Sequence, residues 1–257
     1  MIYKILTIFP EIYDSFLNSS IIARAISKGI IKLELINIRD YTKDKYKRID
    51  TPPIGGGAGL IMKPQPIIDA LQATKTENTY SIITSPRGKT FNQNMAKELS
   101  KKQEILIFCG HYEGFDERVY QYFDDCISIG DYILTGGETA SFVLIDAISR
   151  LVPGVISEGS TAEESFNESL LEYPQFTEPY DFNGDKVPDI LYTGNHKAIK
   201  NYRRYQQLLL TKNLRPDLFE KYNITKEDKK ILESYDNEGC TKIEKEALEK
   251  GKKFLKN

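Results

Sequence analysis

The sequence predicts an α/β fold with a parallel sheet, followed by a smaller and mostly helical C-terminal domain. Short apolar runs alternate with segments of helical periodicity over residues 2–151, which is the pattern of a parallel sheet. Glycine-rich turns follow three of these runs, at Thr84–Gly88, Gly110–Gly114 and Ile129–Glu138. Ligands of such sheets bind at the carboxyl ends of the strands, where backbone without side chains can approach them. We therefore expect one shared ligand crevice there, with ordinary turns as the alternative explanation for the glycines.

The expected strands and helices alternate along this half of the chain. The strands are Ile2–Phe9, Ile31–Ile38, Ser81–Thr84, Glu104–Cys109 and Cys126–Ile129. The helices are Ile12–Ile26, Pro66–Ala73, Gln93–Leu99, Glu117–Phe123 and Thr139–Leu151. The last helix is apolar around most of its circumference, so we expect it to be buried in its own domain or against a partner subunit.

Two long connections interrupt the alternation. The first contains Thr51–Gly59, which is too rich in proline and glycine for a helix, and long segments of this kind are usually functional or disordered. The second, Pro153–Pro188, is rich in Glu, Ser, Pro and Gly and holds the expected domain boundary. We predict an α/β domain at 1–156, a linker at 157–172 and a helical domain at 173–257.

Composition excludes several classes of protein. With 257 residues, 40% of them hydrophobic, the chain can bury a real core, and no stretch is apolar enough to cross a membrane. The net charge of −2 conceals a basic cluster between Arg24 and Arg48 and an acidic one between Glu158 and Glu178. The three cysteines lack paired spacing, which favours a reducing, cytoplasmic compartment. With only two histidines in the chain, we expect no His/Cys metal site.

The second domain opens with cations and tyrosines interleaved on one predicted helix, Asn195–Tyr205. Basic residues with aromatics suit RNA, because cations contact phosphates and rings stack on bases. An ordinary amphipathic helix with a solvated basic face explains the same pattern equally well.

The order and spacing of seven motifs resemble those of the bacterial tRNA (guanine-N1)-methyltransferases of the SPOUT superfamily, the TrmD family. The motifs are Ile8–Pro10, Pro53–Gly59, Ser85–Gly88, Cys109–Arg118, Ser128–Glu138, Leu171–Thr177 and Arg215–Leu218. They span nearly the whole chain. The resemblance implies methyl transfer from S-adenosylmethionine to N1 of the tRNA guanosine just 3′ of the anticodon. It also implies a cytoplasmic homodimer whose active site lies between the subunits.

The resemblance further implies a deep trefoil knot whose loops hold the methyl donor. The donor-binding residues would be Thr84, Ser85, Pro86, Gly110, Tyr112, Glu113, Gly114, Ser128, Ile129, Gly130, Tyr132, Leu134, Gly136 and Gly137. Asp50, His196 and Arg203 would bind the tRNA. Mg²⁺ is a possible cofactor by the same resemblance, although no Mg²⁺ cage can be recognised in the sequence.

The chemistry requires two further groups. A sulfonium methyl is already activated, but guanine N1 carries a proton near neutral pH and needs a general base. A cation near O6 would stabilise the charge that develops as this proton leaves. The resemblance assigns the cation to Arg150 and the base to Glu164, where the family has Asp in a linker one residue longer. Glu163 is the rival base.

Three other functions stay open. A SPOUT methyltransferase acting on another RNA is disfavoured by the C-terminal motif Arg215–Leu218. A tRNA-binding protein that has lost its catalytic base would need a single-turnover assay to be distinguished. A nucleotide enzyme with a phosphate loop at Gly55–Gly57 is disfavoured because no Lys-Ser/Thr pair follows these glycines.

Overall fold

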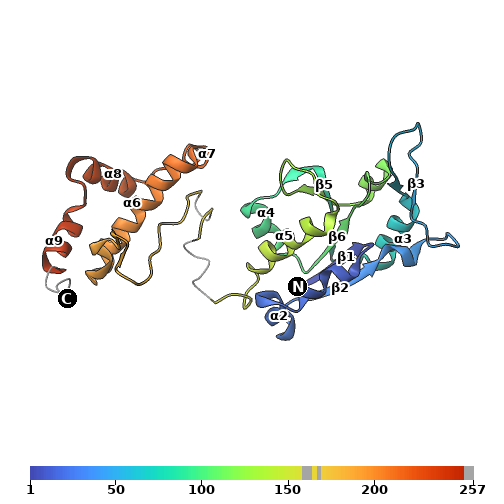
Figure 1. Ribbon diagram of the computed structural model, residues 1–257, viewed down its shortest axis with the longest axis horizontal. Helices are drawn as coiled ribbons and strands as arrows, with labels where there is room; N and C mark the ends of the chain where they lie inside the picture. The colour runs from blue at the N-terminus through green and yellow to red at the C-terminus, as the bar shows by residue number, and fades with distance from the viewer. Residues whose placement is uncertain (158–163, 167–168, 252–257) are drawn as a thin grey trace. The chain divides into compact units, whose positions relative to one another are not determined.

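The computed structural model describes residues 1–157, 164–166 and 169–251, and the chain divides into two compact units, Met1–Thr161 and Ala162–Asn257 (Figure 1). The first unit contains a five-stranded parallel sheet in the order β2-β1-β6-β5-β7. These strands are Lys32–Asn37, Ile2–Thr7, Glu104–Cys109, Thr79–Thr90 and Asp125–Ser128. The predicted α/β class and its parallel sheet are confirmed.

Alternating residues of the central strands pack into two separate cores. On one face, Ile5 of β1 and Ile107 of β6 pack with helices α2 (Ser20–Ser27), α4 (Gln93–Leu99) and α5 (Gly137–Ser149). On the other face, Leu6 and Phe108 pack with α3 (Pro64–Thr74) and with the 3-10 helix η3 (Glu117–Tyr122). Because every residue of β6 is buried, its run is continuously apolar apart from Glu104, as a strand covered on both faces requires.

Three predicted elements differ from the observed ones. The helix expected at 12–26 is split into a 3-10 turn, η1 (Pro10–Tyr13), a short α1 (Asp14–Leu17) and α2, with Ser20 at a positive φ of 58° where α2 begins. The helix expected at 117–123 is the 3-10 helix η3. The turn expected at Thr84–Gly88 is instead a bulge inside β5, whose pairing with β7 shifts register between Thr84 and Lys89.

Gly88 shows why the bulge carries a glycine. A Cβ atom at this position would lie 2.5 Å from the backbone of Ile127 in β7. Ile127 pairs with both Thr84 and Lys89, so the residues between them leave the ladder, and Gly88 is required by the close approach of the two strands.

The glycine-rich connection forms the tip of a small hairpin between β3 (Asp50–Thr51) and β4 (Ile61–Met62), after the 3-10 helix η2 (Ile38–Tyr41). The main chain of β4 also bonds to the loop after β6, through Met62 N–H to the Gly114 carbonyl and Asp116 N–H to the Met62 carbonyl. Since a phosphate loop joins a strand to a helix N-terminus, the antiparallel hairpin contradicts that alternative for the glycines.

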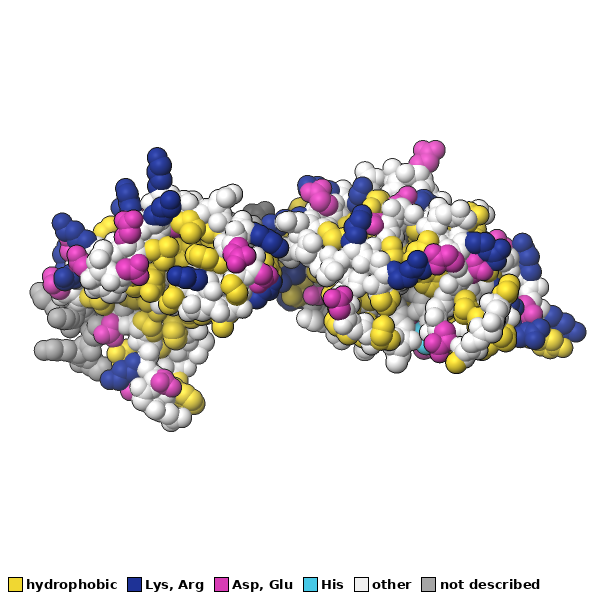
Figure 2. All heavy atoms as spheres, turned by 90° about the horizontal axis from the view of Figure 1, so that it is seen from above, with side chains coloured by type: hydrophobic (Ala, Val, Ile, Leu, Met, Phe, Trp, Pro, Cys, Tyr) yellow, Lys and Arg dark blue, Asp and Glu magenta, His cyan; other side chains and the backbone are white. Residues whose placement is uncertain are grey.

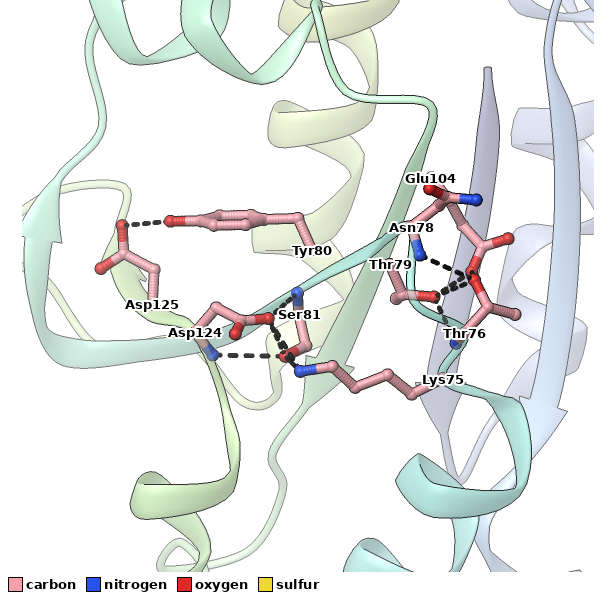
Figure 3. A network of polar contacts seen from close by, with 9 residues as sticks. All are labelled: Lys75, Thr76, Asn78, Thr79, Tyr80, Ser81, Glu104, Asp124 and Asp125. Carbon is pink, nitrogen blue, oxygen red and sulfur yellow. Dashed lines mark hydrogen bonds and ion pairs between the residues drawn. The ribbon is translucent and has the colours of Figure 1, made fainter.

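A buried polar network holds the sheet near the amino ends of β5 and β6 (Figure 3). Lys4 donates to the carboxylate of Glu104 and to the carbonyl of Thr74, each at 2.7 Å, and both charged side chains are about 10% exposed. Glu104 also accepts from the hydroxyls of Thr76 and Thr79. Burial alone would raise the pKa of Glu104, but these donors outweigh burial and hold its pKa below the usual value.

A neighbouring part of the same network joins α3, β5 and the start of β7. Asp124 accepts from the hydroxyl and the main-chain N–H of Ser81 and from the ammonium of Lys75, and Figure 3 shows these groups converging. Burial again opposes the charge, and the donors again lower the pKa of Asp124. Both carboxylates are therefore charged when the protein is folded at neutral pH.

The second unit is mostly helical. It contains a short hairpin of β8 (Asp181–Phe182) and β9 (Asp185–Lys186), the 3-10 helix η4 (Asp189–Tyr192), and helices α6 (His196–Leu214), α7 (Pro216–Phe219), α8 (Lys226–Glu238) and α9 (Lys242–Gly251). Asn195 caps α6 by accepting from Ala198 N–H, so the helix begins there and extends beyond the predicted periodicity. The hydrophobic core of the second unit contains Ile190 of η4, Ala198 of α6 and Ala247 of α9. None of the helices in the described residues is both long and apolar enough for a membrane span.

Candidate functional site

The bulged part of β5 and the loops that follow β6 and β7 surround one cavity of about 560 Å³ in the first unit. This volume is in the range of small-molecule pockets. All residues that the sequence suggested for donor binding line it: Thr84, Ser85, Pro86, Gly110, Tyr112, Glu113, Gly114, Ser128, Ile129, Gly130, Tyr132, Leu134, Gly136 and Gly137. The structure thus brings the three glycine-containing segments together in one crevice.

The loops are locked to one another through their main chains. Gly137 N–H donates to the Gly110 carbonyl at 2.8 Å, and His111 forms an isolated antiparallel bridge with Gly136. A Cβ atom on Gly137 would stand 2.7 Å from the Cα of Cys109, and one on Gly110 would stand 2.9 Å from the ring of Phe115. Protein atoms therefore fill the space beside these glycines, and loop packing, more than ligand approach, requires them.

The cavity wall combines main-chain polar groups with apolar side chains. The loop after β7 is shaped by its own side chains, since Ser128 Oγ donates to the Gly130 carbonyl and the Tyr132 hydroxyl donates to the Ile129 carbonyl. Tyr132 and Ile133 are exposed on its surface. The apolar side chains of such a wall can pack against the faces of a flat heterocyclic ligand, and the main-chain N–H and carbonyl groups can hydrogen-bond to the polar atoms at its edge.

Several lining residues were not foreseen. His111 lies between two foreseen residues, and its ring makes an edge contact with Phe9 at 5.0 Å between centroids. Tyr120 bonds to Ser85 through its hydroxyl, and the Arg87 guanidinium lies 4.8 Å from the Tyr120 ring. The remaining unforeseen lining residues are Phe115, Ile127, Ile133, Thr135 and Ala140. His111, Arg87, Phe115, Ile133 and Thr135 each adjoin a predicted site residue within one of the quoted motifs, so these five had a local signal, whereas Tyr120, Ile127 and Ala140 had none of this kind.

Cys109, at the end of β6 behind this wall, is unsuited to nucleophilic chemistry. Its thiol is fully buried, and burial, followed by the charge of Glu138, raises its pKa to about 12. The surrounding hydroxyls form a closed network, in which Thr7 donates to the buried carboxylate of Glu138 and Tyr13 bonds to Ser141. The arrangement supports non-covalent ligand binding in the cavity.

A second hollow, of about 830 Å³, lies in the C-terminal unit. Its lining brings together Glu164, His196 and Arg203, three residues suggested for the reaction and for RNA binding. His196 and Arg203 are exposed on α6, with Lys197 and Lys200 beside them in the same lining. Figure 2 shows Lys and Arg side chains projecting from the surfaces of both units.

The remaining suggested residues belong to the first unit. Arg150 caps the C-terminus of α5, and Asp50 lies in β3, outside the linings of both cavities. Glu163, the rival base, lies outside the described residues. In the part of the chain that the structure describes, no three His, Cys, Asp or Glu side chains are grouped as metal ligands, so these residues do not fit an Mg²⁺ cage.

The model of the family described as tRNA (Guanine-1)-methyltransferase TrmD matches residues 1–221. The chain belongs to this family. Among its relatives are proteins named tRNA (guanine-N(1)-)-methyltransferase from Clostridium perfringens, Clostridium novyi and Caldicellulosiruptor saccharolyticus. Each is 55% identical to this chain. The alignments cover 90%, 91% and 91% of this chain and 98%, 98% and 97% of the respective relatives. Helices α8 and α9 follow the last residue that the family model matches.

Proposed function

We propose that this protein transfers the methyl group of S-adenosylmethionine to N1 of the guanosine immediately 3′ of the anticodon in tRNA. Membership of the tRNA (guanine-N1)-methyltransferase family supports the reaction class. The observation that carries the assignment of the site is the convergence of the bulge at Thr84–Arg87 with the Gly110 and Ser128–Gly137 loops on one cavity.

The donor would lie in this cavity, with its adenine against the main chain of Ile129, Tyr132 and Leu134 and the rest beside Gly110 and Tyr112. We include in this proposal the deep trefoil knot of the SPOUT superfamily. Membership of the TrmD family supports it.

The donor supplies an electrophilic methyl group, and the protein must align it with the nucleophile and exclude water. Glu164 would accept the N1 proton, and the N1 electron pair would then form the new bond to the methyl carbon as the carbon–sulfur bond breaks. The sulfur keeps the bonding electrons, which gives S-adenosylhomocysteine. Arg150 would stabilise the negative charge on guanine O6 during proton removal.

A homodimer would complete the site. Phe142 of α5 packs on Tyr13 and Phe16, and the adjacent apolar side chains Ile12 and Val143 are 46% and 43% exposed. Together with the family resemblance, these two exposed apolar side chains lead us to propose that a second copy of the chain covers them. The active site would then combine Arg150 of one copy with the linker of the other.

The proposal is tested by methyl transfer from labelled S-adenosylmethionine to tRNA transcripts that differ only at the guanosine beside the anticodon. Label should enter the guanosine transcript and not its adenosine counterpart. Equal labelling of both transcripts would refute the assigned position, and absence of any single-turnover product would favour a tRNA-binding protein without catalysis.

A further inference from the structure

Two adjacent arginines on α6 have opposite environments. Arg204 is neutralised, since its Nε lies 2.7 Å from a carboxylate oxygen of Asp228, which is almost fully buried. Arg203 is exposed, and its guanidinium carbon lies 4.5 Å from the centre of the Tyr173 ring. Among the residues that the structure describes, no carboxylate forms an ion pair with Arg203. Arg204 therefore serves the fold, while the charge of Arg203 remains available to a ligand.

Tyr173 is held in place by its own segment. Leu171 N–H donates to the Thr211 hydroxyl on α6 at 2.9 Å, and Glu172 N–H donates to the Ser165 hydroxyl at 2.9 Å. Thr211 is fully buried, and its hydroxyl also bonds to a carbonyl of α6. The ring under Arg203 is thus anchored to the same helix that carries the arginine.

Stacking on an aromatic ring restricts the orientation of a guanidinium group without using its N–H groups as hydrogen-bond donors. Stacking occupies the face of the cation, and the N–H groups at its edge stay free to bind two oxygens of one phosphate. His196 and Lys200 precede Arg203 by seven and three residues on α6, so the three share one face of the helix and line the same hollow. This face is suited to a polyanion.

We propose that Arg203, oriented by Tyr173, binds a backbone phosphate of the tRNA in this hollow, and that Tyr173 is a positioning residue for tRNA binding. The inference rests on the proposed function and deepens it by naming the group that orients a substrate contact. Because Glu164 lines the same hollow, a strand held here would place its nucleotides beside the proposed base.

The experiment is a double-mutant cycle on tRNA affinity, measured with the full-length protein over a series of salt concentrations. Arg203→Ala should lower the salt slope of log affinity by roughly one. Tyr173→Leu should weaken tRNA binding about two- to fivefold, the size of an exposed cation–π interaction. In the Arg203→Ala background, the same change should have no further effect. Tyr173→Phe, which keeps the ring, should restore binding, and Lys212→Ala, which removes a cation outside the hollow, is the matched control.

Thermal unfolding of each variant, together with calorimetry of the methyl donor, identifies any loss of folding. Equal effects of Tyr173→Leu with and without Arg203 would overturn the positioning role, as would a salt slope unchanged by Arg203→Ala. A Tyr173→Phe protein as weak as Tyr173→Leu would assign the effect to the hydroxyl and refute stacking. Failure of the proposed function is distinguishable, because wild-type protein would then bind tRNA without methylating it, and the cycle could still be measured. Wild-type protein that does not bind tRNA would overturn both proposals.

Discussion

Replacing Gly137 by alanine tests whether the glycines of the donor pocket serve packing or ligand approach. The added methyl group would stand 2.7 Å from the Cα of Cys109 and 3.0 Å from the nitrogen of Gly110. The Thr84 hydroxyl oxygen, a side-chain atom, lies closer still, but the other two neighbours are backbone atoms, so β6 and α5 must move apart. Overpacking of this kind costs about 1–3 kcal/mol. For a domain of this size, that corresponds to a Tm lower by about 2–12 °C.

Gly136→Ala is the matched comparison. Its methyl group would meet the ends of two side chains, Glu138 at 2.5 Å and His111 at 2.6 Å, and its backbone is extended, so any residue can adopt it. Side-chain atoms can move away from an added methyl group by rotation about their own bonds, whereas backbone atoms can do so only if the whole element moves. Gly136→Ala should therefore lower Tm less than Gly137→Ala and still weaken donor binding, because His111 lines the pocket.

Differential scanning calorimetry and titration with S-adenosylmethionine measure the two effects separately. A Gly137→Ala protein with wild-type Tm and no donor binding would refute the packing explanation and restore ligand approach as the reason for the glycine. A larger loss of Tm in Gly136→Ala than in Gly137→Ala would refute the distinction between side-chain and backbone contacts.

Three further predictions address stability and catalysis. Lys4→Met should destabilise the protein by about 3–5 kcal/mol at neutral pH, since it leaves the buried Glu104 carboxylate without its cation, and adding Glu104→Leu should recover much of this loss in urea unfolding. The folded pKa of Glu104 lies below its unfolded value, so the stabilisation by its charged carboxylate is present at neutral pH and is lost as the pH falls through the folded pKa. The stability difference between Lys4→Met and wild type should therefore shrink in acid, and a difference that grows there would contradict this. Glu164→Gln should lower the single-turnover rate by about 10²–10⁴ with donor binding intact, whereas an unchanged rate would eliminate Glu164 as the base. Mixing Arg150→Ala with Glu164→Gln protein should restore part of the activity through heterodimers, and no recovery after verified subunit exchange would indicate sites built within one chain.

The sequence predicted regular elements best where the hydrophobic pattern had no competitor. The strand Glu104–Cys109 and the helix Gln93–Leu99 have the predicted bounds, because the strand is apolar apart from Glu104 and the helix has clear helical periodicity after the capping Asn92. Prediction was wrong at Thr84–Gly88, where proline and glycine indicated a turn. The actual reason for Gly88 is its contact with Ile127, which lies too far along the chain for a local pattern to show.

The residues of the first cavity could be predicted from the sequence, whereas the role proposed for Tyr173 could not. Resemblance to the family supplied the pocket residues, and the carboxyl ends of parallel strands gave a physical reason for them to meet. The role of Tyr173 had no local signal, because it depends on Arg203, a residue thirty positions later, whose neighbour Arg204 carries the same charge but is neutralised by Asp228. Local sequence cannot assign different roles to adjacent arginines when their partners come from other elements.

The interlocked glycine loops also bear on how this pocket responds to inhibitors. Five glycines contribute only main chain to the lining, and two of them, Gly110 and Gly137, have no room for a side chain. A compound that binds through these main-chain groups presents few side chains whose replacement would weaken it. Substitution of the glycines themselves would disturb the packing of β6 against α5. Escape from such a compound by a single amino-acid change would therefore tend to impair the protein that carries it.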